Sequence, residues 1–228
     1  VLVTGFDIIF FWVARMIITG FEFQKQLPFK DVYFTSILRD ESGKKLSKSL
    51  GNSPDPFYLF DKFGTDAVRF GVMLMSPQGS DVLFSEDRLE IGRNFMNKLW
   101  NACRFVEMNL PSDFNYSSGE EIDEKTLDIP EKWILSRLSK TIDSYNYQLE
   151  RFHFNEAAKI LYEFTWTDFC DWYVEIAKLK FYGNDLESAD IARAVSISCL
   201  QTILKLLHPF TPFITEELWQ NFKPRNSG

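Results

Sequence analysis

The segment GKKLSKSLGN, residues 43–52, is the stretch from which the fold of this 228-residue sequence is best inferred. It places Lys44, Lys45 and Lys48 within five residues and borders them with glycines, which let a backbone move and approach a ligand closely. Preorganised positive charge is most useful where negative charge accumulates on a leaving group, so such a loop suits a reacting polyphosphate. A solvated lysine turn or a basic targeting patch is the alternative, and it would be the better explanation of the lysines taken alone.

The sequence around these lysines favours the polyphosphate interpretation. Residues 45–49 resemble the KMSKS signature of the class I aminoacyl-tRNA synthetases, with Leu46 in place of the usual methionine, which keeps an apolar side chain of similar volume. The following LGN, residues 50–52, and GTDAVR, residues 64–69, are also similar to that family. The resemblance implies that an amino acid attacks the α-phosphate of ATP, that pyrophosphate leaves, and that the acyl group passes to the 3′ end of a tRNA. Positioning and charge stabilisation carry such a reaction, without a covalent enzyme nucleophile.

The resemblance also implies roles for individual residues. Lys45 and Lys48 would be the catalytic residues that hold the departing β- and γ-phosphates, and Lys48 is the preferred candidate for this role. The residues expected to bind ATP come from the lysine loop, residues 44–52, and from two earlier segments; they are Gly5, Asp7, Thr35, Ser36, Lys45, Ser47, Lys48 and Ser49. Mg²⁺ is implied only as the counter-ion of the nucleotide, so no prosthetic group and no protein-held metal are expected. Thr35 and Ser36 replace a His-Gly pair usual near the adenine, and this departure is expected to weaken or rearrange contacts to the base.

The first segment narrows the choice of amino acid. TGFDIIFFWVARM, residues 4–16, resembles the corresponding segment of the valine-specific members, whereas isoleucine- and leucine-specific members usually carry other sequences here. Gly5 would allow close backbone approach, and Asp7 could accept hydrogen bonds from the vicinal hydroxyls of a ribose. Ile8 and Trp12 are four residues apart, so a helix would place them on one face as a small apolar pocket for L-valine. Ordinary core packing is the alternative, and it is the commoner explanation of an aromatic stripe at helical spacing.

The sequence divides into an α/β part and an all-α part. Residues 1–85 resemble the second half of a Rossmann-type class I catalytic domain. Residues 86–228 resemble the family's anticodon-binding domain, an antiparallel helical bundle, with a polar surface loop expected at 111–128. The expected elements are helix 6–19, strand 32–38, helices 56–63, 64–75, 86–110, 130–150, 154–182 and 188–208, and a final helix from about Thr215 with Glu216 and Glu217 at the positive end of its dipole.

One face of the first bundle helix carries side chains suited to RNA. Arg93, Asn97, Asn101 and Arg104 fall near i, i+4, i+8 and i+11, and Phe105 lies beside them. Guanidinium and phenyl planes stack on unstacked bases and amides read base edges, so these five residues are expected to bind tRNA(Val). A hydrated helix face explains the same side chains equally well. The motifs PFTPF and EELW near the end of the chain also resemble the anticodon-binding bundle.

Composition limits the classes of partner. The formal net charge of −7 argues against non-specific coating of DNA or RNA, but a local basic face could still dock on a structured RNA. No apolar run reaches the roughly 18 residues of a membrane span, and no secretory signal is visible, so no membrane partner is expected. Cys103, Cys170 and Cys199 lack paired or metal-binding spacing and are expected to be reduced thiols in a cytoplasmic protein. Asp168 and Asp171 are expected to be solvated or paired with Lys or Arg.

Three functions remain open on this basis. The first is a valine-specific synthetase present in part, because the HIGH-type segment and the editing insertion of the family are not among these residues. The 228 residues are then expected to fold without aminoacylating. The second is an isoleucine- or leucine-specific member. The third is a tRNA-binding module without catalysis, against which the lysine loop and Asp7 argue, since such a module does not need ATP chemistry.

Overall fold

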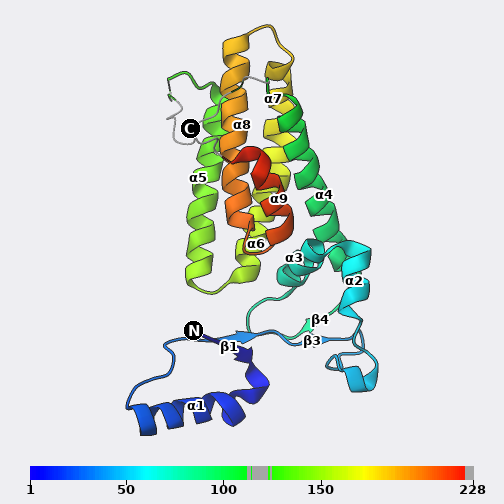
Figure 1. Ribbon diagram of the computed structural model, residues 1–228, viewed down its shortest axis with the longest axis vertical. Coiled ribbons are helices and arrows are strands. Elements are labelled where there is room, and N and C mark those ends of the chain that lie inside the picture. Colours follow the sequence, from blue (N-terminus) through cyan, green and yellow to red (C-terminus); the bar gives the residue numbers. More distant parts are fainter. Residues whose placement is uncertain (112–113, 115–122, 124, 224–228) are drawn as a thin grey trace.

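The protein has an elongated helical bundle with a smaller α/β part at one end. The computed structural model describes residues 1–111, 114, 123 and 125–223, so most of the polar stretch 111–128 lies outside the described residues. Figure 1 shows the bundle above and the α/β part, which contains the N-terminus, below. This arrangement confirms the expected fold class, an α/β part followed by an all-α part.

A parallel pair of strands opens the α/β part. β1 (Leu2–Gly5) pairs with β2 (Val32–Thr35), with Leu2 opposite Val32 and Gly5 opposite Thr35. Parallel neighbours need a crossover connection, and the chain supplies it as one helix of mixed geometry. This helix runs through a 3₁₀ turn (Phe6–Ile8), a π segment (Ile9–Val13), α1 (Ala14–Thr19) and a second π segment (Gly20–Gln24).

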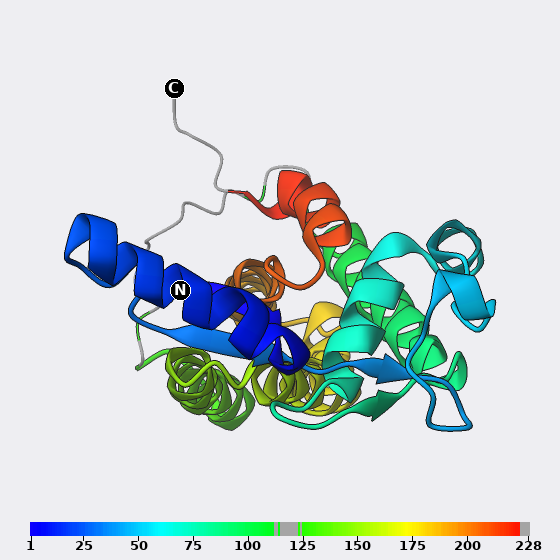
Figure 2. The ribbon, with the colours of Figure 1, turned by 90° about the horizontal axis from the view of Figure 1, so that it is seen from below.

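The crossover helix and its flanks expose an unusual amount of apolar surface. The exposed large apolar side chains between residues 1 and 27 are Val1, Val3, Phe6, Ile8, Phe10, Phe11, Trp12, Met16, Ile18, Phe21, Phe23 and Leu27. Figure 2, which views the molecule from below, shows this helix crossing in front of the bundle helices. Large exposed apolar surface is typical of sites where a protein, a membrane or a ligand binds.

The expected strand 32–38 is wrong in its extent, because the chain changes partner within it. β2 ends at Thr35, and β3 (Leu38–Arg39) pairs in parallel with β4 (Val82–Leu83) instead. Between the two strands the Ser36 hydroxyl donates to the carbonyl of Pro77 at 2.6 Å. This hydrogen bond and the pairing of β3 with β4 lead the chain from one sheet to the next.

Two helices connect the strands to the bundle. α2 (Pro56–Phe63) begins with proline in its first turn and is capped by Asp55, whose carboxylate accepts from the Phe57 N–H at 3.0 Å. α3 (Thr65–Met75) follows after Gly64 alone. The short connection keeps both helices together at the junction of the two parts (Figure 1).

The bundle packs long helices around one apolar core. It contains α4 (Asp87–Met108), α5 (Ile129–Glu150), α6 (Phe154–Glu163), α7 (Val174–Phe181), α8 (Leu186–Leu207) and α9 (Pro212–Phe222). A π segment (Phe164–Tyr173) joins α6 to α7, so the expected helix 154–182 is confirmed as one continuous element. Fully buried rings such as Phe95, Phe164, Phe169 and Tyr173 fill the core.

The last helix begins three residues earlier than the sequence predicts. Pro212 is its first residue, so Glu216 and Glu217 lie beyond the first turn and do not occupy the positive end of the dipole. A residue from α3 does so instead: the carboxylate of Asp66 accepts from the Ile214 N–H at 2.6 Å. Arg69, one turn along α3, donates through Nε to the carbonyl of Phe210 at 3.1 Å. The GTDAVR segment therefore fastens the α/β part to the α8–α9 turn.

Other predictions about single residues are confirmed. The three cysteines are free and buried in helices. Asp168 pairs with Arg137 at 2.8 Å and Asp171 with Lys98 at 2.5 Å. Within the described residues no helix combines the length and the hydropathy that a bilayer span requires.

Candidate active site and RNA-binding face

The carboxyl ends of β1 and β2 bring two of the predicted ATP-binding segments together. Gly5 and Thr35 are partners in the strand register; Ser36 follows Thr35 directly, and Asp7 lies two residues after Gly5. In open α/β sheets, ligands bind in the crevice outside the carboxyl ends of the strands. The structure therefore places these four residues where a nucleotide site is expected, although the Ser36 hydroxyl is already engaged with the Pro77 carbonyl.

Gly5 makes room for the Asp7 carboxylate. A Cβ atom added at Gly5 would lie only 2.7 Å from Asp7 Oδ1. Such a contact is shorter than van der Waals packing allows, so a side chain here would displace the carboxylate. The close approach predicted for Gly5 is thus made in this structure by the neighbouring Asp7.

The lysine loop is held in shape by two polar side chains at its ends. Asp40 Oδ1 accepts from the Lys44 N–H at 2.9 Å, and Asp40 Oδ2 accepts from Asn52 Nδ2 at 2.7 Å. Asn52 Oδ1 in turn accepts from the Ser47 N–H at 2.8 Å. The same Asn52 amide lies 3.3 Å from the carbonyl of Lys45. We call Asp40 and Asn52 the brace of the loop, and it was not among the residues that the sequence singled out as a site.

The Asp40 carboxylate of the brace is ionised over the whole physiological range of pH. Hydrogen bonds from Asn52, from the Ser42 hydroxyl and from the Lys44 N–H lower the pKa of Asp40 from 3.8 to about 2. Asp40 therefore stays ionised and keeps accepting these bonds until the pH falls below the ordinary range of a carboxylic acid. Its contribution to the loop is present above pH 4 and is lost as the pH falls through about 2.

Both glycines that border the lysines are needed for the backbone path. Gly43 has φ 79° and Gly51 has φ 67°, the left-handed region that glycine adopts without steric cost. Gly43 closes a turn in which its N–H donates to the Asp40 carbonyl at 2.9 Å. Gly51 ends a short 3₁₀ turn, Lys48–Leu50. The glycines thus permit the tight path that the brace then holds.

Lys45 reaches across to the strand end and pairs with Asp7. Lys45 Nζ lies 2.7 Å from Asp7 Oδ2, and this hydrogen bond lowers the pKa of Asp7. The residue predicted to bind phosphate and the residue predicted to bind ribose are therefore neighbours. Lys48 is exposed at the start of the 3₁₀ turn, and the Ser47 and Ser49 hydroxyls lie 2.8 Å apart.

The predicted amino-acid pocket stays a prediction. Ile8 is 37% exposed and Trp12 is 57% exposed, so neither side chain is ordinary core in this structure. Both belong to the apolar surface of the crossover helix, on the same segment as Asp7.

The RNA-binding face also stays a prediction, with one residue in a different role. Arg93, Asn97, Asn101 and Arg104 are all exposed on α4, as a binding stripe requires. Phe105 is half-buried, and its ring packs on a core ring at 6.0 Å between centroids, with a lysine ammonium 5.2 Å from its centre. The phenyl ring is thus already used in helix packing, whereas the four polar side chains remain open to solvent.

Comparison with known families decides the class of this site. Residues 1–85 match the tRNA synthetases class I (I, L, M and V), and residues 131–227 match the anticodon-binding domain of tRNA ligase. The chain belongs to the class I tRNA synthetases. The α/β part with the lysine loop and the helical bundle thus each correspond to a part of such an enzyme.

Relatives of known name are similar along almost the whole chain. A valine--tRNA ligase of Fusobacterium nucleatum is 54% identical over 228 residues, which covers 97% of this chain and 25% of that protein. A valine--tRNA ligase of Syntrophotalea carbinolica is 51% identical over 219 residues, which covers 96% of this chain and 24% of that protein. The chain therefore spans about a quarter of the length of these class I synthetases.

Solved structures show the same fold at low sequence identity. The Agrobacterium radiobacter LeuRS–tRNA–LeuAMS ternary complex superposes with a TM-score of 0.71 at 20% identity, covering 98% of this chain and 27% of that one. The Mycobacterium tuberculosis methionyl-tRNA synthetase with methionyl-adenylate gives a TM-score of 0.72 at 18% identity, covering 95% of this chain and 42% of that one. These solved structures thus share the fold of this chain, an α/β part followed by a helical bundle.

Proposed function

We propose that this chain is part of a cytoplasmic valine--tRNA ligase, which activates L-valine with ATP to valyl-adenylate and transfers the valyl group to tRNA(Val). The identity of 54% to a valine--tRNA ligase over 97% of the chain carries the proposal. The 228 residues would supply the lysine loop of the active site and the helices that bind tRNA. Because the chain spans about a quarter of such a ligase, it is not expected to catalyse the reaction alone.

The lysine loop is suited to hold the pyrophosphate that leaves in the first step. Lys45 and Lys48 would contact the β- and γ-phosphates of ATP, which binds with Mg²⁺ as its counter-ion. Negative charge grows on the leaving group, so positive side chains held in place by the Asp40–Asn52 brace stabilise the transition state without reorganisation. Lysine is a compact point charge on a flexible stem and can follow the phosphates as they move away.

Asp7 is the proposed acceptor for the ribose hydroxyls. In this structure its carboxylate pairs with Lys45 at 2.7 Å, with the Lys45 side chain 59% exposed. A pair this open to solvent is weak, so ATP can exchange it for two new contacts, ribose to Asp7 and phosphate to Lys45. The pair holds the two groups near each other before the nucleotide arrives.

Amino-acid specificity tests the proposed identity. In the full-length protein, valine is expected to support ATP–pyrophosphate exchange, with kcat/KM for isoleucine lower by about 10–200-fold, the effect of one methylene in an apolar pocket. The measurement compares valine, isoleucine and leucine at equal enzyme concentration. The 228-residue chain alone serves as the negative control. A preference for isoleucine or leucine would contradict the valine assignment and leave the family assignment intact.

The brace offers a second test of the site. Asn52→Asp in the full-length protein is expected to raise the KM for ATP about 10-fold or more, because a carboxylate would face Asp40 and both amide donor bonds would be lost. Asn52→Ala should have a smaller effect, since it removes the bonds without adding repulsion. The KM values for ATP and for valine are measured separately. If the two variants changed both values equally, the brace would not act on the nucleotide.

A further inference from the structure

A pocket of about 410 Å³ lies where the α/β part meets the bundle, between α3, α4 and α9. Its walls are mostly apolar, formed by Met96 and Trp100 of α4 and by Phe213 and Ile214 of α9. Two of these side chains are strongly exposed for their size: Trp100 is 42% exposed and Phe213 is 65% exposed. Figure 1 shows α3 and α9 adjacent at this level, with α4 beside them. No residue of the lysine loop is among the described residues that line the pocket.

Two carboxylates give this pocket its charge. Asp66 is only 7% exposed; its Oδ2 accepts from the Ile214 N–H at 2.6 Å, while its Oδ1 has no hydrogen-bond partner among the described residues. Glu217 lines the pocket from α9 and is exposed. No lysine, arginine or histidine is among the described residues that line the pocket. A buried carboxylate oxygen without a partner is costly, so a donor that reached Asp66 Oδ1 would stabilise the pocket.

Aromatic and acidic side chains together line this pocket, so it is suited to a cationic side chain with a flat or apolar part. Aromatic faces attract guanidinium and ammonium groups, and carboxylates pair with them, with arginine preferred where both contacts are made together. A phosphate group would be repelled by both acids, which argues against RNA as the occupant. The pocket therefore fits the side chain of an arginine presented by protein.

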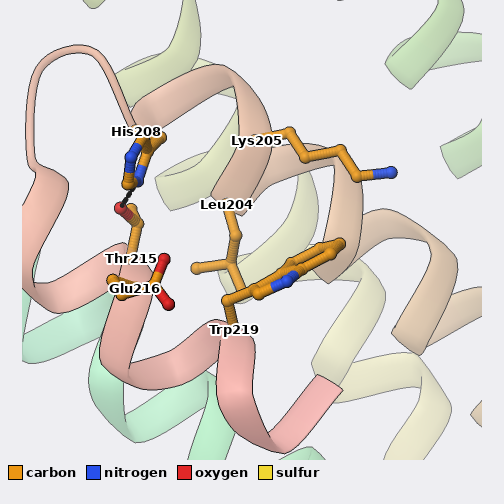
Figure 3. Close-up of a pocket in the computed structure, with 6 residues that line it drawn as sticks. All are labelled: Leu204, Lys205, His208, Thr215, Glu216 and Trp219. Carbon is orange, nitrogen blue, oxygen red and sulfur yellow. Dashed lines mark hydrogen bonds between the residues drawn. The ribbon is translucent and has the colours of Figure 1, made fainter. Parts of the chain in front are cut away.

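A neighbouring pocket on α9 shows the contrast. Figure 3 shows it lined by His208, Lys205, Trp219, Leu204, Thr215 and Glu216. There the His208 ring is bonded to the Thr215 hydroxyl at 2.9 Å, and the Lys205 ammonium already lies 5.2 Å from the centre of the Trp219 ring. That pocket has its own cation over its own aromatic ring. Among the residues that the structure describes, the pocket of Asp66 and Glu217 is lined by aromatic rings and acids but by no cation.

We propose that the pocket between α3, α4 and α9 binds an arginine side chain from a segment of the same polypeptide outside these 228 residues. About three quarters of the length of the valine--tRNA ligases lies outside the region that this chain matches, so such a segment is available in proteins of this kind. Its binding would complete the hydrogen bonds of Asp66 and cover Trp100 and Phe213. It would also strengthen the junction that Asp66 makes between α3 and α9.

Site-specific photo-crosslinking in the full-length protein tests this proposal. p-Benzoylphenylalanine replaces Phe213, and the cross-linked peptides are identified by mass spectrometry with and without tRNA. We expect a cross-link within one polypeptide to a segment that contains an arginine and lies outside these residues. Glu217→Lys should lower its yield about 10-fold by replacing attraction with repulsion. Glu216→Lys is the matched control, because Glu216 is the adjacent acid on α9 and lines the other pocket; its yield should stay within about 2-fold.

Several results would overturn the proposal. They are a cross-link only to tRNA, a cross-link only between two copies, no cross-link, or equal losses in the Glu217→Lys and Glu216→Lys variants. Both acids are exposed, and circular dichroism checks that each variant keeps its helical content. Cross-linking measures contact and not amino-acid preference. A protein that activates another amino acid would therefore give the same result, and the two proposals can fail separately.

Discussion

Lys48→Ala in the full-length enzyme is expected to lower the rate of amino-acid activation by about 10²–10³-fold, the usual effect of losing one preorganised group that faces a developing anion. Lys48 is exposed at the first position of the 3₁₀ turn Lys48–Leu50, and the brace holds the residues just before it. Lys45 is also needed, but it has a second partner in Asp7. We therefore expect Lys45→Ala to cost less than Lys48→Ala and the double variant to cost most.

The effect of Lys48→Ala should appear in kcat and not in the KM for valine. An interaction that strengthens as pyrophosphate leaves lowers the barrier without tightening substrate binding. Pre-steady-state formation of the adenylate measures this step directly. Lys44→Ala is the matched control, because its exposed side chain has no assigned role and alanine keeps the backbone N–H that Asp40 accepts. Unchanged activation by the Lys45 and Lys48 variants would refute the role of the loop.

The lysine loop could be predicted from the sequence because its information is local. Ten consecutive residues contain the lysines, the serines and both glycines, and Gly43 and Gly51 do adopt the left-handed backbone that only glycine takes easily. The limits of most helices were also predictable, since apolar residues recur at helical spacing. The family resemblance rests on the same local motifs and is confirmed by the matches to both parts of the chain.

The partners of these residues could not be predicted, because they are distant in the chain. Asp7 lies 38 residues from Lys45, and Asp66 lies 148 residues from Ile214. Periodicity shows which face of an element is buried, but it does not show which element covers that face. The start of α9 was misplaced for this reason: Glu216 and Glu217 looked like dipole partners, whereas the capping carboxylate comes from α3.

Apolar character alone was also ambiguous. Ile8 and Trp12 could have been core or pocket by spacing, and the structure leaves both exposed on the crossover helix. Phe105 could have been a stacking platform or a packing residue, and its ring contacts the core. The polar stripe on α4 beside it remains open to solvent. Spacing identifies these side chains, but only the surrounding surface decides their use.

Gly92→Ala is expected to destabilise the chain by about 3 kcal/mol or more, at the upper end of the cost of overpacking. A Cβ atom at Gly92 would lie 2.2 Å from the carbonyl oxygen of Ala67, so α3 and α4 would have to separate. The separation would also disturb the stacked rings of Phe70 and Phe95, one turn further along each helix, whose centroids are 4.8 Å apart. The higher helix propensity of alanine offsets only about 1 kcal/mol of this loss in the free energy of unfolding.

Thermal unfolding followed by circular dichroism measures this loss as a fall in Tm of about 6–12 °C for a chain of this size. Asn94→Ala, an exposed change to the same residue on the same helix, should shift Tm by no more than about 2 °C. A Gly92→Ala protein as stable as the parent would show that α3 and α4 do not need this close approach. Hydrogen exchange at the Ile214 amide measures locally whether the contact between α3 and α9 is kept. Asp66 lies next to Ala67 and accepts from that amide, so displacing α3 should speed its exchange, whereas Asn94→Ala should leave it protected.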